Sequence, residues 1–216
     1  MKNTVFSRFM RRVADILLSL VSGILLLPLA VAVLLLLLIR SPGNPFYAQK
    51  RVGRDGESIT VVKFRTMRRG ATLSAEQQAE YTLEYKLEDD PRLIGYRKAG
   101  DGRKCFGAIL RRTSLDELPQ LYVNVLLLGN MSLVGPRPIL AEELAAQYRA
   151  EEQTMLLSVK PGLTGYWQAY ARGRALYANG ERQRMELFYV ANRSVWLDLK
   201  ILFRTVLAVI SKAGAK

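Results

Sequence analysis

Hydrophobic residues are concentrated in one continuous run near the start of the chain, from Ile16 to Ile39. At about 1.5 Å rise per residue, these 24 residues would form a helix of roughly 36 Å, long enough to cross the hydrocarbon layer of a membrane. Pro28 lies near the middle of the run, where a proline removes a backbone donor and kinks or breaks a helix. Basic residues flank the run on both sides: Lys2, Arg8, Arg11 and Arg12 before it, and Arg40, Lys50, Arg51 and Arg54 after it.

This charge pattern predicts a re-entrant membrane hairpin. Basic residues favour the cytoplasmic side of a membrane, and a single crossing would export one of the two basic groups. A helix that enters the membrane, bends at Pro28 and returns would keep both groups inside. An ordinary signal anchor is the competing interpretation, because charge bias sets orientation only statistically. A cleaved signal peptide fits poorly, since its apolar core would be about 7–15 residues long and would end in a small-x-small site.

The pattern after the apolar run predicts one globular domain that is mainly helical. Asp55-Gly56 is a turn signal, and the β-branched residues of Ser58 to Phe64 follow it, so we expect a small β-hairpin at 46–66. The segment from Leu197 to Ile210 predicts an amphipathic helix that lies in the membrane interface or packs on the core. The other expected elements are a polar helix over 73–88, a loop over 95–104, and helical segments over 106–128 (interrupted at Pro119), 138–157 and 182–208.

The expected fold class is therefore α+β, mainly helical. Residues 1–40 form the basic N-terminus and the re-entrant membrane helix. We expect residues 41–216 to form a compact cytosolic domain with a small β-hairpin and interfacial amphipathic helices.

Composition limits the chemistry that this domain can perform. The formal charge of +13 and the pI near 10.1 suit lipid headgroups, nucleotide phosphates or nucleic acid as partners. No RNP-type or zinc-finger spacing supports nucleic acid, which we do not expect as a partner. The chain has no histidine, which excludes imidazole catalysis and His-based zinc sites, and its single Cys105 excludes an internal disulfide. Carboxylates, hydroxyls, Lys, Arg, Tyr or an oxygen-bound metal must do the chemistry.

The strongest candidate for chemistry is the acidic pair Asp116-Glu117, which follows two arginines and Thr113-Ser114. One carboxylate could act as a nucleophile or metal ligand while the other positions a proton or ion. Ordinary capping, with acids in the first turn of a helix and Thr113 or Ser114 as N-cap, explains the same pattern. Arg137, held between two prolines, is suited to bidentate phosphate recognition.

Taken in order, these segments resemble the bacterial sugar transferase family, and in particular its small monotopic phosphoglycosyl transferases. The resemblance covers nearly the whole chain. It rests on Lys63-Phe64-Arg65-Thr66-Met67, Ser114-Leu115-Asp116-Glu117-Leu118-Pro119-Gln120-Leu121, Met131-Ser132-Leu133-Val134-Gly135-Pro136-Arg137-Pro138, Pro161-Gly162-Leu163-Thr164-Gly165, and Tyr189 with Asn192, Ser194 and Asp198.

The resemblance implies transfer of a sugar 1-phosphate from a UDP-sugar to undecaprenyl phosphate. Asp116 would attack the β-phosphate, UMP would leave, and the phosphosugar would pass from Asp116 to the lipid. Glu117 would complete the catalytic dyad, and Mg²⁺ would bind at Asp116. The residues implied in substrate or phosphate binding are Lys63, Arg65, Arg112, Arg137, Arg174 and Glu186.

The resemblance also implies a bent re-entrant helix and a catalytic domain on the cytoplasmic face of the bacterial inner membrane. The expected partners are a UDP-sugar, undecaprenyl phosphate and membrane lipid, with a homodimer as a further option. The chain departs from its relatives in having Leu27 before the proline, two extra residues within Tyr122 to Leu128, and Asn130 and Glu186 where aspartate is usual. A membrane-seated scaffold or inactive relative that binds anionic lipid is the alternative function.

Overall fold

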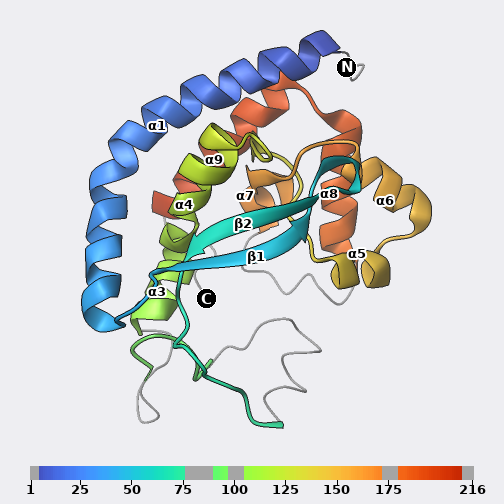
Figure 1. Cartoon of the computed structure of the whole chain (residues 1–216). Coiled ribbons are helices and arrows are strands. Elements are labelled where there is room, and N and C mark those ends of the chain that lie inside the picture. The colour runs from blue at the N-terminus through green and yellow to red at the C-terminus, as the bar shows by residue number, and fades with distance from the viewer. Residues whose placement is uncertain (1–4, 76–89, 97–104, 172–179, 211–216) are drawn as a thin grey trace. The chain divides into compact units, whose positions relative to one another are not determined.

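The computed structural model describes residues 5–75, 90–96, 105–171 and 180–210. In these segments the fold is mainly helical with two small two-stranded sheets, which confirms the α+β class. Figure 1 shows the elements, which are, in chain order, α1 (Val5–Arg40), β1 (Phe46–Val52), the 3₁₀ turn η1 (Arg54–Gly56), β2 (Ser58–Phe64), α3 (Phe106–Thr113), the 3₁₀ turn η3 (Leu115–Glu117), α4 (Leu118–Gln120), the π-helix η4 (Leu121–Leu127), β3 (Ser132–Val134), α5 (Ala141–Gln147), α6 (Ala150–Leu157), β4 (Gly162–Thr164), α7 (Tyr166–Ala171), α8 (Glu181–Asn192) and α9 (Val195–Ile210).

The chain divides into two compact units, which are described separately. The larger unit contains Met1–Leu27, Ala48–Val62 and Pro119–Lys216. The smaller unit contains Pro28–Tyr47 and Lys63–Leu118. The predicted division into residues 1–40 and 41–216 stays a prediction.

The apolar run forms α1, which is helical on both sides of Pro28. Its segment Phe6–Arg40 is long and apolar enough to cross a membrane. The sequence expectation of a long apolar helix is thus confirmed, and the re-entrant course of that helix stays a prediction.

The part of α1 in the larger unit buries two polar residues and exposes many apolar ones. Asp15 and Ser19 are buried, whereas Leu17, Val21 and Ile24 are exposed. A helix of a water-soluble domain shows the opposite pattern, because its apolar stripe faces the core. This reversed pattern is the one expected of a helix whose outer side faces lipid.

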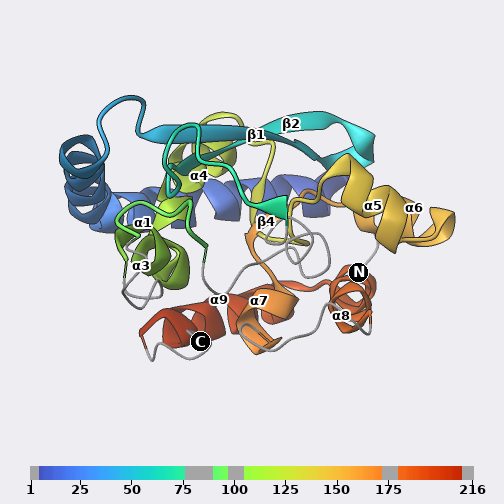
Figure 2. The same ribbon diagram turned by 90° about the horizontal axis from the view of Figure 1, so that it is seen from below.

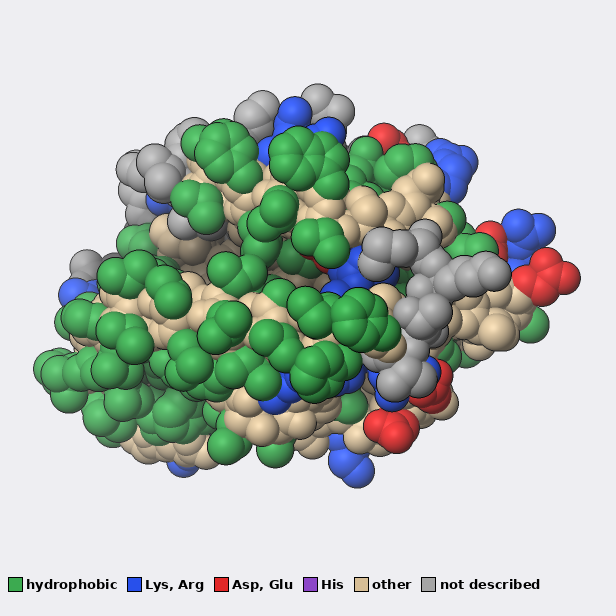
Figure 3. Space-filling model, turned by 90° about the horizontal axis from the view of Figure 1, so that it is seen from above, with side chains coloured by type: hydrophobic (Ala, Val, Ile, Leu, Met, Phe, Trp, Pro, Cys, Tyr) green, Lys and Arg blue, Asp and Glu red, His purple; other side chains and the backbone are tan. Residues whose placement is uncertain are grey.

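Helix α9 adds further exposed apolar side chains in the same unit. Trp196 and Phe203 are each 67% exposed, while Ile201 on the same helix is fully buried. Figure 3 shows hydrophobic side chains gathered over much of the face that is turned toward the viewer. The amphipathic helix expected over 197–210 is therefore confirmed, and α9 both packs on the core and exposes an apolar face.

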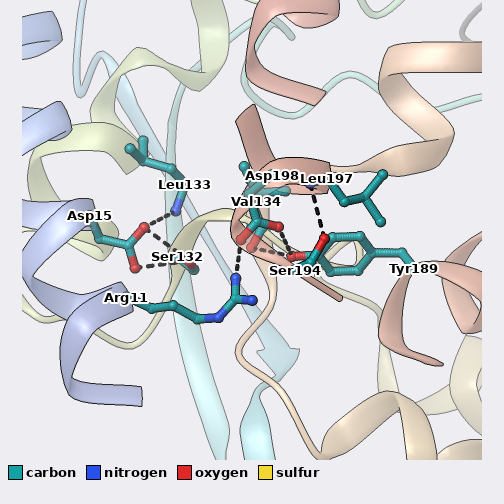
Figure 4. Close-up of polar contacts among 9 residues, drawn as sticks. All are labelled: Arg11, Asp15, Ser132, Leu133, Val134, Tyr189, Ser194, Leu197 and Asp198. Atoms are coloured by element: carbon teal, nitrogen blue, oxygen red, sulfur yellow. Dashed lines mark hydrogen bonds and ion pairs between the residues drawn. The ribbon is translucent and has the colours of Figure 1, made fainter. Parts of the chain in front are cut away.

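Polar contacts hold the start of α1 onto the larger unit, as Figure 4 shows. The Asp15 carboxylate accepts hydrogen bonds from the Ser132 hydroxyl (2.8 Å) and from the backbone N–H of Leu133 (3.0 Å). Arg11 forms an ion pair with Asp198 on α9. These contacts join α1 to β3 and α9, so the protein satisfies the charged groups of Arg11 and Asp15 on this apolar helix.

Arg12 and Tyr122 add two further contacts between α1 and the π-helix η4. The Arg12 guanidinium donates to the backbone carbonyls of Val125 and Leu126. The Tyr122 hydroxyl donates to the carbonyl of Gly23 at 2.7 Å. The expected extra residues fall within η4, where the Leu128 N–H bonds to the Val123 carbonyl five residues back. A π-type turn contains one residue more than an α-turn, so the π-helix can accommodate extra residues in this segment.

The predicted β-hairpin is confirmed as β1 and β2, which pair in one sheet. The tip carries Asp55 and Gly56, both with positive φ (57° and 83°). The Asp-Gly signal is typical of this backbone conformation, since Gly has no Cβ to oppose positive φ and Asp tolerates it.

The second sheet, β3 with β4, was not predicted from the sequence. The strands run parallel, with Ser132 opposite Gly162 and Val134 opposite Thr164. They have three residues each, too few for an alternating pattern to be detected. A Cβ on Gly162 would lie 2.0 Å from the backbone nitrogen of Gly135, so this pairing requires glycine.

The core of the larger unit lies where these elements meet. Its buried members are Ile59, Val61, Leu121, Val125, Met131, Leu133, Val134, Tyr189 and Ile201. Helix α7 packs against α8 and α9 beside this core (Figure 2). The core thus draws on β2, η4, β3, α8 and α9.

Three helical predictions differ from the structure in continuity. The segment over 138–157 is two helices, α5 and α6, because Tyr148 between them has extended backbone. The segment over 182–208 is also two helices, because the Ser194 hydroxyl accepts the Leu197 N–H and begins α9. The segment over 106–128 breaks at Ser114, ahead of the expected Pro119. The helix over 73–88 and the loop over 95–104 lie largely outside the described residues.

Replacing Asp15 with alanine should destabilise the larger unit. The change leaves the Ser132 hydroxyl and the Leu133 N–H without their buried acceptor, a loss of about 2 kcal/mol. The unfolding midpoint of the detergent-solubilised protein should fall by roughly 4–8 °C. Glu151→Ala, which removes an exposed carboxylate, is the control and should change the midpoint little. An Asp15→Ala midpoint equal to that of Glu151→Ala would show that this contact does not anchor α1.

Candidate active site

The acidic pair lies at a sharp break in the backbone of the smaller unit. Helix α3 ends at Thr113, and Ser114 adopts the left-handed conformation with φ 58° and ψ 17°. Asp116 and Glu117 follow at once in the 3₁₀ turn η3. Left-handed backbone is strained for a residue with a Cβ, and such strain is concentrated at functional sites. Ser114 is the N-cap residue of this turn, as the alternative interpretation expected, but it makes no side-chain cap hydrogen bond.

The two adjacent carboxylates have different surroundings. Asp116 is only 8% exposed, whereas Glu117 is half-buried. The Lys63 ammonium donates to Glu117 Oε1 at 2.6 Å. Lys63 lies on β2, so this ion pair joins the acidic turn to the hairpin. Glu117 thus pairs directly with a cation, while Asp116 is almost completely buried.

Burial and, to a smaller extent, the adjacent Glu117 charge together raise the pKa of Asp116 to about 7. Lys63 and Arg111 oppose this effect, because their positive charges favour the carboxylate. At neutral pH the Asp116 carboxyl is therefore divided between its protonated and ionised forms. A carboxylate in such surroundings is poorly solvated and more reactive toward an electrophile than an exposed one.

A second group of side chains supports the acidic turn from within the smaller unit. Arg111 donates to the Thr66 hydroxyl at 2.9 Å and lies 3.6 Å from the carboxylate of Asp90. Asp90 is buried and accepts two hydrogen bonds from the Arg92 guanidinium, at 2.8 and 2.9 Å. Burial alone would raise the pKa of Asp90, but these contacts hold it below its usual value. Asp90 therefore remains ionised at neutral pH and fixes Arg111.

Sequence reasoning did not single out Asp90 or Thr66 as supporting residues. The available signal was the alternation of acid and base around a proline, which is too common to identify a buried pair. Gly107 allows the start of α3 to approach the backbone of Thr66 closely, because a Cβ there would lie 2.3 Å from the Thr66 carbonyl oxygen.

Arg65, predicted to bind phosphate, contacts backbone carbonyls in this structure. Its guanidinium donates to the carbonyls of Ser41 (2.5 Å) and Asn44 (2.9 Å), in the segment after α1. The side chain is buried. Arg65 thus fixes the linker that joins α1 to β1. Arg112 is exposed on α3 and belongs to the same unit as the acidic pair.

Arg137 and Glu186 belong to the larger unit, where the structure brings them together. Glu186 on α8 is buried and accepts a hydrogen bond from the Tyr148 hydroxyl at 2.7 Å. Burial raises the pKa of Glu186, while a backbone hydrogen bond from Arg137 lowers it. Glu186 therefore supports the proline-flanked turn that presents Arg137. Arg174 lies outside the described residues.

The two carboxylates of the acidic pair are suitable ligands for a hard divalent cation such as Mg²⁺. Among the described residues there is no cluster of three or more His, Cys, Asp or Glu side chains. Mg²⁺ is commonly held by one or two carboxylates together with substrate phosphates, so such a cluster is not required. Asp116 and Glu117, adjacent in η3, fit that description.

Comparison with known proteins agrees with these motifs. Residues 6–212 match the family described as "Bacterial sugar transferase". Because this match covers nearly the whole chain, the protein belongs to the bacterial sugar transferase family.

Several curated relatives have names that describe their reactions. The chain is 36% identical over 217 residues to the undecaprenyl-phosphate galactose phosphotransferase of Salmonella typhimurium, covering 97% of this chain and 42% of that protein. It is 37% identical over 205 residues to the UDP-glucose:undecaprenyl-phosphate glucose-1-phosphate transferase of Escherichia coli, covering 93% of this chain and 40% of that protein. It is 35% identical over 213 residues to the exopolysaccharide production protein ExoY of Sinorhizobium fredii, covering 95% of this chain and 87% of that protein. The chain thus spans less than half the length of the first two.

The Asp116 carboxyl should titrate near pH 7 in metal-free buffer, against a usual value of 3.8. Because folding raises this pKa, the stability that the protonated group contributes is full below pH 3.8 and is lost as the pH rises through 7. Isotope-edited infrared spectra of the carboxyl band, with Asp116→Asn subtracted, measure the titration. Lys63→Met should raise the midpoint further, and Lys50→Met should leave it unchanged. A midpoint near 4, or one that Lys63→Met does not move, would contradict this account.

Proposed function

We propose that this chain transfers a sugar 1-phosphate from a UDP-sugar to undecaprenyl phosphate. The observation that supports it most directly is the buried Asp116 beside Glu117, whose charge is compensated by Lys63. Family membership and the names of the relatives support the same reaction class.

The proposed reaction has two displacements at one phosphorus atom. In the first, an Asp116 oxygen bonds to the β-phosphorus of the UDP-sugar, and the bond from that phosphorus to the bridging oxygen breaks. UMP leaves with the bonding electrons, and the sugar phosphate remains on Asp116. In the second, an oxygen of undecaprenyl phosphate attacks the same phosphorus, and the Asp116 carboxylate is released with polyprenyl diphosphosugar as product.

The surroundings of Asp116 suit the nucleophile in this scheme. Its burial disfavours the free carboxylate, and forming a neutral acyl phosphate bond removes that charge. Lys63 holds Glu117 in place, and the charge of Glu117 opposes ionisation of its neighbour. Mg²⁺, when bound at Asp116 and Glu117, would offset the charge of the substrate phosphates. The proposed phosphate contacts are Arg112, Arg137 and Arg174, because one guanidinium group can donate hydrogen bonds to two phosphate oxygens at once.

We further propose that α1 is re-entrant, with both of its ends on the cytoplasmic face of the bacterial inner membrane. The two basic flanks and the inward-facing Asp15 and Ser19 support this course. It would keep the catalytic residues at headgroup depth, where a soluble nucleotide sugar and a lipid phosphate can meet.

A cysteine-labelling experiment tests the course of α1. Ser7→Cys and Ser41→Cys would be introduced one at a time into a Cys105→Ala background. A membrane-impermeant maleimide should label both positions in inside-out vesicles and neither in intact spheroplasts. Labelling of the two positions from opposite sides would establish a single crossing in place of the re-entrant helix.

Release of UMP tests the reaction itself. The protein in nanodiscs with undecaprenyl phosphate and Mg²⁺ should release UMP from at least one donor in a panel that includes UDP-glucose and UDP-galactose. Asp116→Asn should reduce release by roughly 10³-fold or more, because the nucleophile is lost. Asp55→Asn, on the exposed hairpin tip, removes the same charge and should keep full activity. Release that persists in Asp116→Asn would exclude the aspartyl intermediate, and no release from any donor would favour a scaffold.

A further inference from the structure

The larger unit contains a small cavity with a strongly basic wall. Its volume is about 50 Å³. The lining residues come from the start of α1, the hairpin tip, β3, the segment before β4 and the segment before α9: Arg8, Arg11, Arg12, Asp15, Arg54, Ser132, Val159, Lys160 and Arg193. Six of these nine side chains are cationic and one is acidic.

Some of these charges are compensated by neighbouring carboxylates. Arg11 pairs with Asp198, as Figure 4 shows. Arg54 pairs with Asp55 at 2.9 Å. Asp15 provides the remaining carboxylate. Six cations against these three carboxylates leave an excess of three positive charges.

Within the described residues, the other cations donate hydrogen bonds only to neutral groups or make none, although Asp15 and Asp198 also lie near some of them. Arg12 donates to backbone carbonyls, and the Lys160 ammonium donates to the Gly129 carbonyl at 2.6 Å. The Nε of Arg193 is buried and has no hydrogen-bond partner within the described residues. Burial lowers the pKa of Lys160, and repulsion from Arg12, Arg54 and Arg193 lowers it further. The cavity therefore concentrates positive charge that an anion would relieve.

The size of the cavity limits the anion. About 10–15 Å³ suffices for one water molecule, whereas pockets for drug-sized ligands measure roughly 300–1,000 Å³. A volume near 50 Å³ suits one tetrahedral oxyanion and excludes a nucleoside or sugar ring. Guanidinium groups recognise phosphate oxygens by charge-assisted hydrogen bonds, so a phosphate group is the fitting ligand.

The position of the cavity on α1 identifies the source of the phosphate. Arg8, Arg11 and Arg12 lie within the first turns of α1, which exposes many apolar side chains along its length. Basic side chains at the edge of an apolar membrane-facing surface meet the headgroup layer, where anionic lipids supply phosphates. We propose that this cavity binds the phosphate of an anionic phospholipid headgroup and so seats the larger unit on the membrane. The proposal depends on lipid contact by α1 and not on sugar transfer.

A thermal-shift experiment on the full chain in zwitterionic detergent tests this site. Dioctanoyl phosphatidylglycerol should raise the unfolding midpoint by roughly 5–10 °C at about 100 times Kd. Dioctanoyl phosphatidylcholine and inorganic phosphate at the same concentration should give much smaller shifts. Arg54→Gln with Arg193→Gln should abolish the response to phosphatidylglycerol. Lys50→Gln with Arg184→Gln removes the same charge from exposed positions outside the cavity and should keep it.

Each shift is measured against the same variant's own midpoint without lipid, so a change in basal stability does not obscure the result. Arg54→Lys with Arg193→Lys, which keeps both charges, should retain part of the response and guards against a variant that fails to fold. An equal shift with inorganic phosphate would overturn the lipid as source. Three results would overturn the site. The wild-type protein could show no shift with phosphatidylglycerol, or the glutamine variant of Arg54 and Arg193 could still respond. The response could also be lost in the Lys50 and Arg184 control.

Discussion

The buried carboxylate of Asp15 is the contact on which the arrangement of the larger unit depends. The hydrophobic effect does not favour packing of an apolar helix on a protein surface over lipid, because acyl chains solvate its leucines equally well. A carboxylate on that helix favours the protein, since it needs hydrogen-bond donors that lipid cannot supply. Ser132 and Leu133 provide these donors at 2.8–3.0 Å, which fixes the start of α1 against β3. Arg11, with Asp198, then fixes α9.

The acidic turn of the smaller unit shows how neighbouring residues of the same type acquire different properties. Asp116 and Glu117 are both carboxylates, yet only Glu117 receives the Lys63 ammonium. Burial and the charge of Glu117 then act on Asp116 in the same direction. The left-handed backbone at Ser114 turns the chain from α3 into η3 and so places the pair. Burial and the Glu117 charge together outweigh the opposing charges of Lys63 and Arg111 and raise the pKa of Asp116 to about 7.

The sequence was sufficient for the features that depend on composition or on local turns. The apolar run predicted α1, and the Asp55-Gly56 signal predicted the hairpin. The acidic pair was identified from the residues, but the environment that distinguishes Asp116 from Glu117 depends on Lys63, 54 positions away. The parallel pairing of β3 and β4 also escaped prediction, because a three-residue strand has no periodicity of its own. Arg65 illustrates the same limit, since a motif cannot show that a guanidinium contacts the Ser41 and Asn44 carbonyls.

The contact between Asp15 and Ser132 also orders events during synthesis of the chain. The two residues are 117 positions apart, and translation proceeds at about 5–20 residues per second. Asp15 is therefore synthesised roughly 6–23 s before its donors, Ser132 and Leu133. During that interval the carboxylate lacks the partners that hold it in the folded unit. The contact that fixes the start of α1 against β3 must therefore form late in the synthesis of the chain.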